Sequence, residues 1–164
     1  MRILNDRQVR QKIRRLAIEI LENNFEEPEI ILAGINNNGM AFALLLMEEL
    51  KTLTRIPIIL TRIRLNPANP VGDPVKLEMP EAELQGKSVI LVDDVANTGR
   101  TLFYACKPLL DILPKKIETA VLVDRTHKSF PILVNYIGLS LATTLLQEIE
   151  VRIRDTEEFY AELR

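Results

Sequence analysis

Short runs of apolar residues alternate along this chain with segments of helical periodicity, and no other feature restricts the possible folds more. Helices are predicted over residues 6–23, with Asp6 as the N-cap, and over 40–53, and a buried strand over 29–35 lies between them. Further strands are predicted over residues 56–64, 88–92, 119–124 and, shorter, near 133–137 and 148–153. A last short helix is expected from Thr156. Uniformly apolar strands that alternate with helices form a mostly parallel sheet with helices on both faces, so we expect an α/β fold.

The length and composition are those of one globular domain. The chain has 164 residues, of which 47% are hydrophobic, and its formal net charge is −2. Its longest apolar stretch, residues 40–47, is shorter than the ~18 residues that a bilayer span needs, so no membrane partner is expected. Cys106 is the only cysteine, and the N-terminal residues lack the apolar core of a secretory signal. Both observations favour a reducing, cytoplasmic setting.

One segment has no usable periodicity. Residues 65–84 carry Gly72 and several prolines, and an unstructured stretch of this length inside a compact domain is often a lid. A twisted antiparallel hairpin is the alternative, and the sequence leaves both open. The chain contains no linker, so we expect a single domain over residues 1–164 with a flexible lid or hairpin at 65–84.

Ligands of open parallel sheets bind where the strands end. This rule points to four segments, namely residues 34–39, 62–66, 93–101 and 124–127.

Two adjacent aspartates, Asp93 and Asp94, end an apolar strand and precede a turn and a helix that begins near Gly99. Unpaired backbone N–H groups at a helix start bind phosphate, Gly99 lets the backbone approach closely, and Thr98 and Thr101 add hydroxyl donors. The two carboxylates suit the vicinal hydroxyls of a ribose or a hydrated Mg²⁺. A purely structural role is the alternative, but a helix cap needs only one residue and adjacent buried acids repel each other. The segment therefore predicts a site for a ribose 5-phosphate.

The stretch from Asp93 to Thr101 resembles the diphosphoribose-binding motif of type I phosphoribosyltransferases. The resemblance extends over nearly the whole chain to the pyrimidine-operon attenuator/uracil phosphoribosyltransferase family. It is carried by the opening helix, by Ala33-Gly34-Ile35 at a strand end, and by the late segment Val123-Asp124-Arg125-Thr126-His127-Lys128. It implies the type I phosphoribosyltransferase fold with a small hood, and transfer of ribose 5-phosphate from 5-phosphoribosyl pyrophosphate (PRPP) to a nucleobase, uracil in the first place.

The resemblance also implies roles for individual residues. Asp93, Asp94 and Arg64 would be catalytic, and the two aspartates would hold Mg²⁺, directly or through water. The base pocket would contain Asp124, Arg125 and His127. Separately, we expect the apolar run 139–146 to pack in the core or an interface and to help shape the base pocket. The substrate-binding residues would be Gly34, Asn36, Asn37, Asn38, Gly39, Val95, Ala96, Asn97, Thr98, Gly99, Arg100 and Thr101. The family expectation for the assembly is a homodimer or a higher homo-oligomer.

The sequence departs from the family at the pyrophosphate loop. Attenuators commonly carry Lys-Thr-Arg there, whereas this chain has Asn36-Asn37-Asn38 and brings no positive charge. This departure favours a second hypothesis, a non-catalytic regulator that senses a nucleotide or PRPP. Asn97 stands where purine-specific relatives carry an acid, which argues against a 6-oxopurine substrate.

RNA binding is a third activity that the family suggests. The first fifteen residues carry six basic side chains against one acid, Asp6, and such a helix face contacts either RNA phosphates or solvent. Ile18 and Leu139 stand where attenuators carry a histidine and a lysine. We therefore do not expect RNA as a partner.

Overall fold

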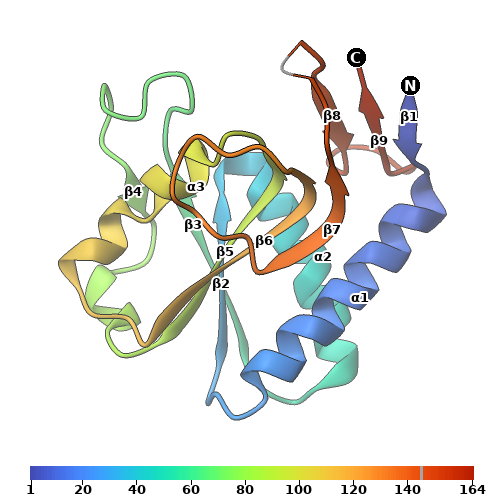
Figure 1. The fold of residues 1–164 in the computed structure, drawn as a ribbon. Coiled ribbons are helices and arrows are strands. Elements are labelled where there is room, and N and C mark those ends of the chain that lie inside the picture. Colours follow the sequence, from blue (N-terminus) through green and yellow to red (C-terminus); the bar gives the residue numbers. More distant parts are fainter. Residues whose placement is uncertain (145) are drawn as a thin grey trace.

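The computed structural model describes residues 1–144 and 146–164, and a six-stranded sheet forms its centre (Figure 1). The strand order is β4-β3-β2-β5-β6-β7, and every neighbouring pair is parallel except β3 and β4. The strands are β2 (Ile30–Ile35), β3 (Ile58–Arg64), β4 (Lys76–Leu77), β5 (Ser88–Ala96), β6 (Lys116–Arg125) and β7 (Tyr136–Leu141). The predicted mostly parallel α/β fold is confirmed.

The helices cover both faces of this sheet because successive strand residues point to opposite sides. The long helices α1 (Asp6–Asn24) and α2 (Asn36–Leu53) pack with Leu32, Ile90 and Leu122 in one core cluster. Ile31 and Leu91 belong to a second cluster, together with residues of α3 (Arg100–Ala105) and of the 3-10 helices η1 (Glu81–Leu84) and η2 (Lys107–Asp111). Within the described residues, no helix has the length and apolar character needed to cross a membrane.

Helix α1 begins one residue earlier than its predicted cap implies. Its N-cap is Asn5, whose side chain accepts from the backbone N–H of Gln8, while the Gln8 side chain accepts from the backbone N–H of Asn5. Asp6 lies in the first turn, where it accepts from Arg10 and from the backbone N–H of Phe159. The reciprocal capping box therefore outcompetes Asp6 for the cap position.

The two chain ends form a second, smaller sheet. Strands β1 (Arg2–Leu4), β9 (Tyr160–Leu163) and β8 (Ile149–Arg152) pair antiparallel in that order, and both termini lie beside each other in Figure 1. The predicted helix from Thr156 is wrong: Phe159, Ala161 and Leu163 are buried at alternate positions, which is the period of a strand. We call this sheet the hood.

The segment without periodicity returns to the central sheet. β4 pairs antiparallel with β3, through Ile63 opposite Leu77 and Arg64 opposite Lys76, and the Thr61 hydroxyl accepts from the backbone N–H of Met79. This is the arrangement of the hairpin alternative, with a long connection between the two strands. Whether the connection closes over a ligand stays a prediction.

Candidate functional site

A cavity of about 600 Å³ opens at the carboxyl ends of β2 and β5. We call it the central cavity. The end of β5 supplies two of its acidic residues, the start of α2 supplies three amides, and the hood supplies Glu148, Ile149 and Arg154. The predicted segments 34–39 and 93–101 therefore meet in one place, as the strand-end rule requires.

Asp93 and Asp94 are the two acidic residues that β5 contributes to this cavity. Asp93 is buried and accepts from the backbone N–H of Asp94 at 2.9 Å, and Asp94 accepts from the backbone N–H of Val95 at 2.9 Å. Among the described residues, no basic side chain forms an ion pair with either carboxylate. The structure therefore brings together one buried and one half-buried carboxylate without an ion-pair partner among the described residues.

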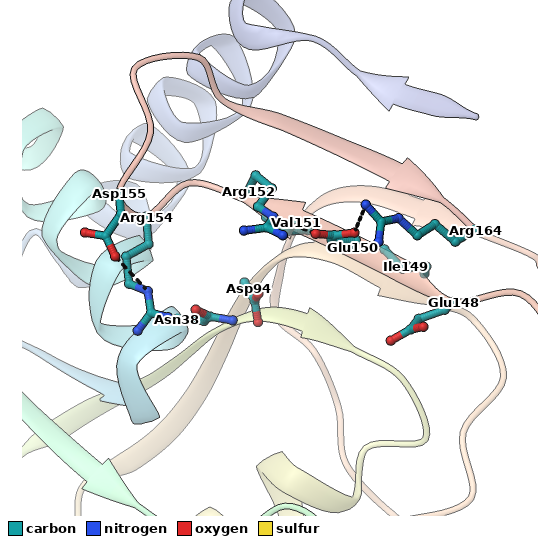
Figure 2. Close-up of a pocket in the computed structure, with 10 residues that line it drawn as sticks. All are labelled: Asn38, Asp94, Glu148, Ile149, Glu150, Val151, Arg152, Arg154, Asp155 and Arg164. Atoms are coloured by element: carbon teal, nitrogen blue, oxygen red, sulfur yellow. Dashed lines mark hydrogen bonds and ion pairs between the residues drawn. The ribbon is translucent and has the colours of Figure 1, made fainter.

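The pKa values of both carboxyls reflect this environment. Burial raises the pKa of Asp93 well above its ordinary value, and the charge of Asp94 raises it further. Burial also raises the pKa of Asp94, although hydrogen bonds from its surroundings, including the Asn38 amide that faces it in Figure 2, act in the opposite direction. A bound cation or a pair of hydroxyl donors would relieve the cost of keeping both groups charged.

The turn after β5 forms a second, smaller pocket of about 230 Å³, which we call the turn pocket. Gly99 has a φ of 86°, in the left-handed region that favours glycine, and a Cβ at this position would lie 2.4 Å from Cγ2 of Ile132. The lining residues are Pro67, Val95, Ala96, Asn97, Thr98, Gly99, Arg100, Thr101 and Leu102. All of the residues predicted to bind the phosphate thus surround one pocket.

The three asparagines lie in the first turn of α2 and not in a loop before it, which corrects the expected start of this helix at residue 40. Asn36 has a left-handed φ of 52°, and its side chain accepts from the backbone N–H of Leu65 and donates to the Leu65 carbonyl, both at 3.0 Å. Asn37 accepts from Arg62 at 3.4 Å. Asn36 therefore joins the ends of β2 and β3, while Asn38 is directed at Asp94 (Figure 2).

Two of the glycines let α2 approach the sheet. A Cβ on Gly34 would lie 2.5 Å from Cα of Met40, and a Cβ on Gly39 would lie 2.4 Å from the carbonyl oxygen of Val92. Gly34 and Gly39 are buried, and neither lines the central cavity. Their position therefore sets how closely the amides of α2 approach Asp93 and Asp94.

The predicted base-pocket residues lie apart from one another. Arg125 is buried, donates to the carbonyls of Thr144 and Gln147 at 2.8 and 2.6 Å, and lines a cavity of about 310 Å³ with Asn97 and Glu148. Asp124 forms a 2.6 Å ion pair with Lys128. His127 is exposed and lines none of the cavities described here for residues 1–144 and 146–164. Of the three, only Arg125 lines one of these cavities, and the assignment of all three to a base pocket stays a prediction.

The apolar run 139–146 is divided between the core and the surface. Leu139 and Leu141 pack against the larger core cluster, whereas Leu146 is exposed and lines the Arg125 cavity. Residue 145 of this run lies outside the described residues.

The phosphoribosyl transferase domain family matches residues 2–153. The chain belongs to this family. Curated relatives include the bifunctional protein PyrR of Streptococcus uberis, 35% identical over 161 residues that cover 94% of this chain and 91% of the relative, and that of Bacillus pumilus, 34% identical over 165 residues with 95% and 92% covered.

Solved structures show the same fold. A hypoxanthine-guanine phosphoribosyltransferase from Bacillus anthracis has a TM-score of 0.70 and is 22% identical, with 85% of this chain and 81% of that chain covered. A hypoxanthine phosphoribosyl transferase from Trypanosoma cruzi has a TM-score of 0.77 at 16% identity, with 100% and 91% covered. The type I phosphoribosyltransferase fold and the pentosyltransferase class expected from the sequence are confirmed.

Against this family background, the structure places Arg64 away from the cavities. Arg64 forms a 3.1 Å ion pair with Glu78, and both side chains are about half-exposed, at 53% and 47%. Arg100, in contrast, lines the turn pocket. Its guanidinium donates to the Pro67 carbonyl at 2.5 Å and so joins this pocket to the connection before β4.

The hood contributes residues that sequence reasoning did not assign to the site of this phosphoribosyltransferase. A cavity of about 520 Å³ is lined by Asp94 and by residues of the hood, with Arg152, Arg154 and Arg164 among them. Figure 2 shows these side chains. The available signal was the alternation of charged and apolar residues along 148–154, which fits a strand with one charged face. Nothing local to that segment indicated which element this face would cover.

Proposed function

We propose that this chain transfers ribose 5-phosphate from PRPP to a nucleobase, with uracil as the base, and releases pyrophosphate. The observation that carries the proposal is the position of Asp93 and Asp94 in the central cavity, directly before the residues that surround the turn pocket. This arrangement offers carboxylate acceptors for a ribose diol beside backbone and hydroxyl donors for a 5′-phosphate.

The chemistry follows from that binding mode. The turn of residues 95–101 binds the 5′-phosphate, and Asp93 and Asp94 accept hydrogen bonds from the 2′ and 3′ hydroxyls. A base nitrogen gives up its proton to solvent and forms a bond to C1 of the ribose, as the bond from C1 to the pyrophosphate oxygen breaks and its electron pair leaves with pyrophosphate. Positive charge develops on the ribose ring in this step, and the nearby carboxylates stabilise it.

Asp93 and Asp94 also fit a hydrated Mg²⁺, which we propose as the metal. Asp93 and Asp94 offer adjacent carboxylate oxygens, and neither has an ion-paired cation among the described residues. Those residues contain no group of three or more His, Cys, Asp or Glu side chains that could hold a metal, so the protein itself would supply at most two ligands at this site. Mg²⁺ keeps several waters and takes few protein carboxylates, so two aspartates acting through water suit it. When bound, Mg²⁺ neutralises negative charge on the pyrophosphate.

The choice of uracil rests on the residues at the base end. Asn97 cannot accept a proton as an acid would, and it lines the Arg125 cavity together with Gln147. The resemblance to the attenuator/uracil phosphoribosyltransferase family and the PyrR relatives point the same way. We also propose that the chain is one domain and that its 65–84 segment closes over the site to exclude water. We further propose that the protein assembles as a homodimer or higher homo-oligomer in the cytoplasm.

A product assay tests the proposal. Purified protein is incubated with PRPP, Mg²⁺ and uracil, then with other bases, and the nucleoside monophosphate is separated by chromatography. We expect uracil turnover that disappears when Asp93→Asn and Asp94→Asn are combined, together with the loss of ribose 5-phosphate binding in calorimetry. The matched control is Asp111→Asn, an exposed carboxylate on η2. Unchanged ribose 5-phosphate affinity in the double variant would show that the site lies elsewhere.

The uncharged Asn36–Asn38 turn favours a second candidate, a regulator that binds PRPP or a nucleotide without turnover. In that case the same assay gives no product with any base, while the wild-type protein binds ribose 5-phosphate and the double aspartate variant does not.

A further inference from the structure

The central cavity has a charge imbalance that a bound pyrophosphate would make larger. Its described lining residues include three carboxylates, those of Asp93, Asp94 and Glu148, and a single cation, Arg154. The asparagines of α2 add only neutral amides. Because pyrophosphate carries several negative charges, its binding here requires positive charge from the protein as well as from a metal.

The other arginines near this end of the sheet are held elsewhere. Arg152 and Arg164 form ion pairs with the two oxygens of Glu150, at 2.5 and 2.6 Å. Arg62 lies behind the asparagine turn, where it donates to Asn37, and does not line the central cavity. Arg64 and Arg100 are engaged with the segment 65–84, as described above.

Arg154 differs from these arginines. It lies in the bend after β8, and its one ion pair joins its Nε to Oδ2 of Asp155 at 3.7 Å, beyond hydrogen-bond distance. The Asp155 side chain is 90% exposed, so solvent screens this pair strongly. Figure 2 shows the guanidinium of Arg154 beside Asn38, with the Asn38 amide between it and Asp94. The charge is therefore available at the place where the α2 turn lacks one.

We propose that Arg154 binds the pyrophosphate group of PRPP and supplies, from the hood, the positive charge that the Asn36–Asn38 turn does not carry. The guanidinium has a planar array of donors that matches two phosphate oxygens, and it stays charged throughout the physiological pH range. The inference rests on the proposed function and adds to it a binding residue from a part of the chain remote from the phosphate turn.

Calorimetry on the full chain with Mg²⁺ tests this assignment, with pyrophosphate, PRPP and ribose 5-phosphate as separate probes. We expect Arg154→Gln to weaken pyrophosphate and PRPP binding by about 10- to 100-fold, the usual worth of a charge-assisted hydrogen-bonded contact. Ribose 5-phosphate affinity should stay within about twofold of wild type, because that probe lacks the pyrophosphate. Arg154→Lys keeps the charge and should lie between the two. The control is Arg55→Gln, an exposed arginine before β3 at the opposite end of the sheet.

A charge supplied from the other side of the cavity gives a second test. Adding Asn38→Arg to Arg154→Gln should restore pyrophosphate affinity, since both positions border the central cavity. The assignment is overturned if Arg154→Gln binds pyrophosphate as tightly as wild type, or if it loses ribose 5-phosphate equally, which would indicate a structural role. Failure of the proposed function is distinct, since it appears as wild-type protein that does not bind PRPP or as Asp93/Asp94 variants that bind it normally.

Discussion

The unpaired carboxylate of Asp93 makes a prediction about stability that is independent of any assay of activity. In the wild-type protein, Oδ1 of Asp93 accepts from the backbone N–H of Asp94 at 2.9 Å, and the amide oxygen of Asp93→Asn can keep this hydrogen bond. The substitution removes a carboxylate that has no ion-pair partner among the described residues. The amide also brings N–H donors toward the Asp94 carboxylate. We therefore expect the ligand-free variant to be more stable than wild type at neutral pH, by about 1–2 kcal/mol.

The pH dependence fixes the sign of this effect. Because the pKa of Asp93 is raised in the folded state, its protonation favours folding, and that contribution is lost as the pH rises through the raised pKa. The advantage of Asp93→Asn over wild type should be largest at neutral pH and should shrink toward the ordinary aspartate pKa of 3.8.

Urea unfolding at several pH values measures the difference, and thermal unfolding should show a rise in Tm of roughly 2–8 °C at neutral pH. Asp124→Asn is the matched control, because Asp124 is also a buried aspartate near a strand end but is paired with Lys128 at 2.6 Å. Removing its charge should cost about 2–3 kcal/mol. The reasoning is refuted if Asp93→Asn is no more stable than wild type at neutral pH, or if its advantage does not depend on pH.

Two further substitutions test the packing and the charge of the α2 turn. Gly39→Ala should destabilise the fold by about 1–3 kcal/mol in urea unfolding, because the new Cβ would lie 2.4 Å from the Val92 carbonyl oxygen. Alanine is the better helix former, so a more stable variant would contradict this expectation. Asn38→Arg alone should raise kcat/KM for PRPP by roughly 5- to 30-fold if the missing loop charge limits loss of pyrophosphate, and a flat or lower rate would mean that the asparagine has another role.

The central sheet and the aspartate-turn segment were predictable because their signals are local. Apolar runs identify β2 and β5 without reference to any partner, and Asp93, Asp94 and Gly99 are close together in sequence as well as in space. The start of α2 was missed because no side chain caps it and Asn36 enters the helix through a left-handed φ of 52°. Asparagine adopts a left-handed φ more readily than most residues, but that tolerance suits a loop as well as a helix start, so it did not locate the first turn.

The hood was not predictable as a unit because its pairings join distant residues. Leu4 pairs with Ala161, and the isolated three-residue strand β1 has no pattern of its own. The segment after Thr156 was assigned to a helix because its charged residues hide the alternation of Phe159 and Ala161. Arg154 could not be placed at the same cavity as Asp94 until the hood had been formed.

The central position of β9 in the hood has a consequence for synthesis of the protein. Because β9 lies between β1 and β8, neither neighbour has a partner in this sheet until residues 160–163 have left the ribosome. The aspartates of β5 are made much earlier, so a nascent chain holds these carboxylates before it can position the Arg154 guanidinium at the same cavity. Contacts of such long sequence separation form late in folding. Competence to bind a pyrophosphate ester should therefore arise only after β9 has been made, and a change that keeps β1 from pairing with β9 should delay it.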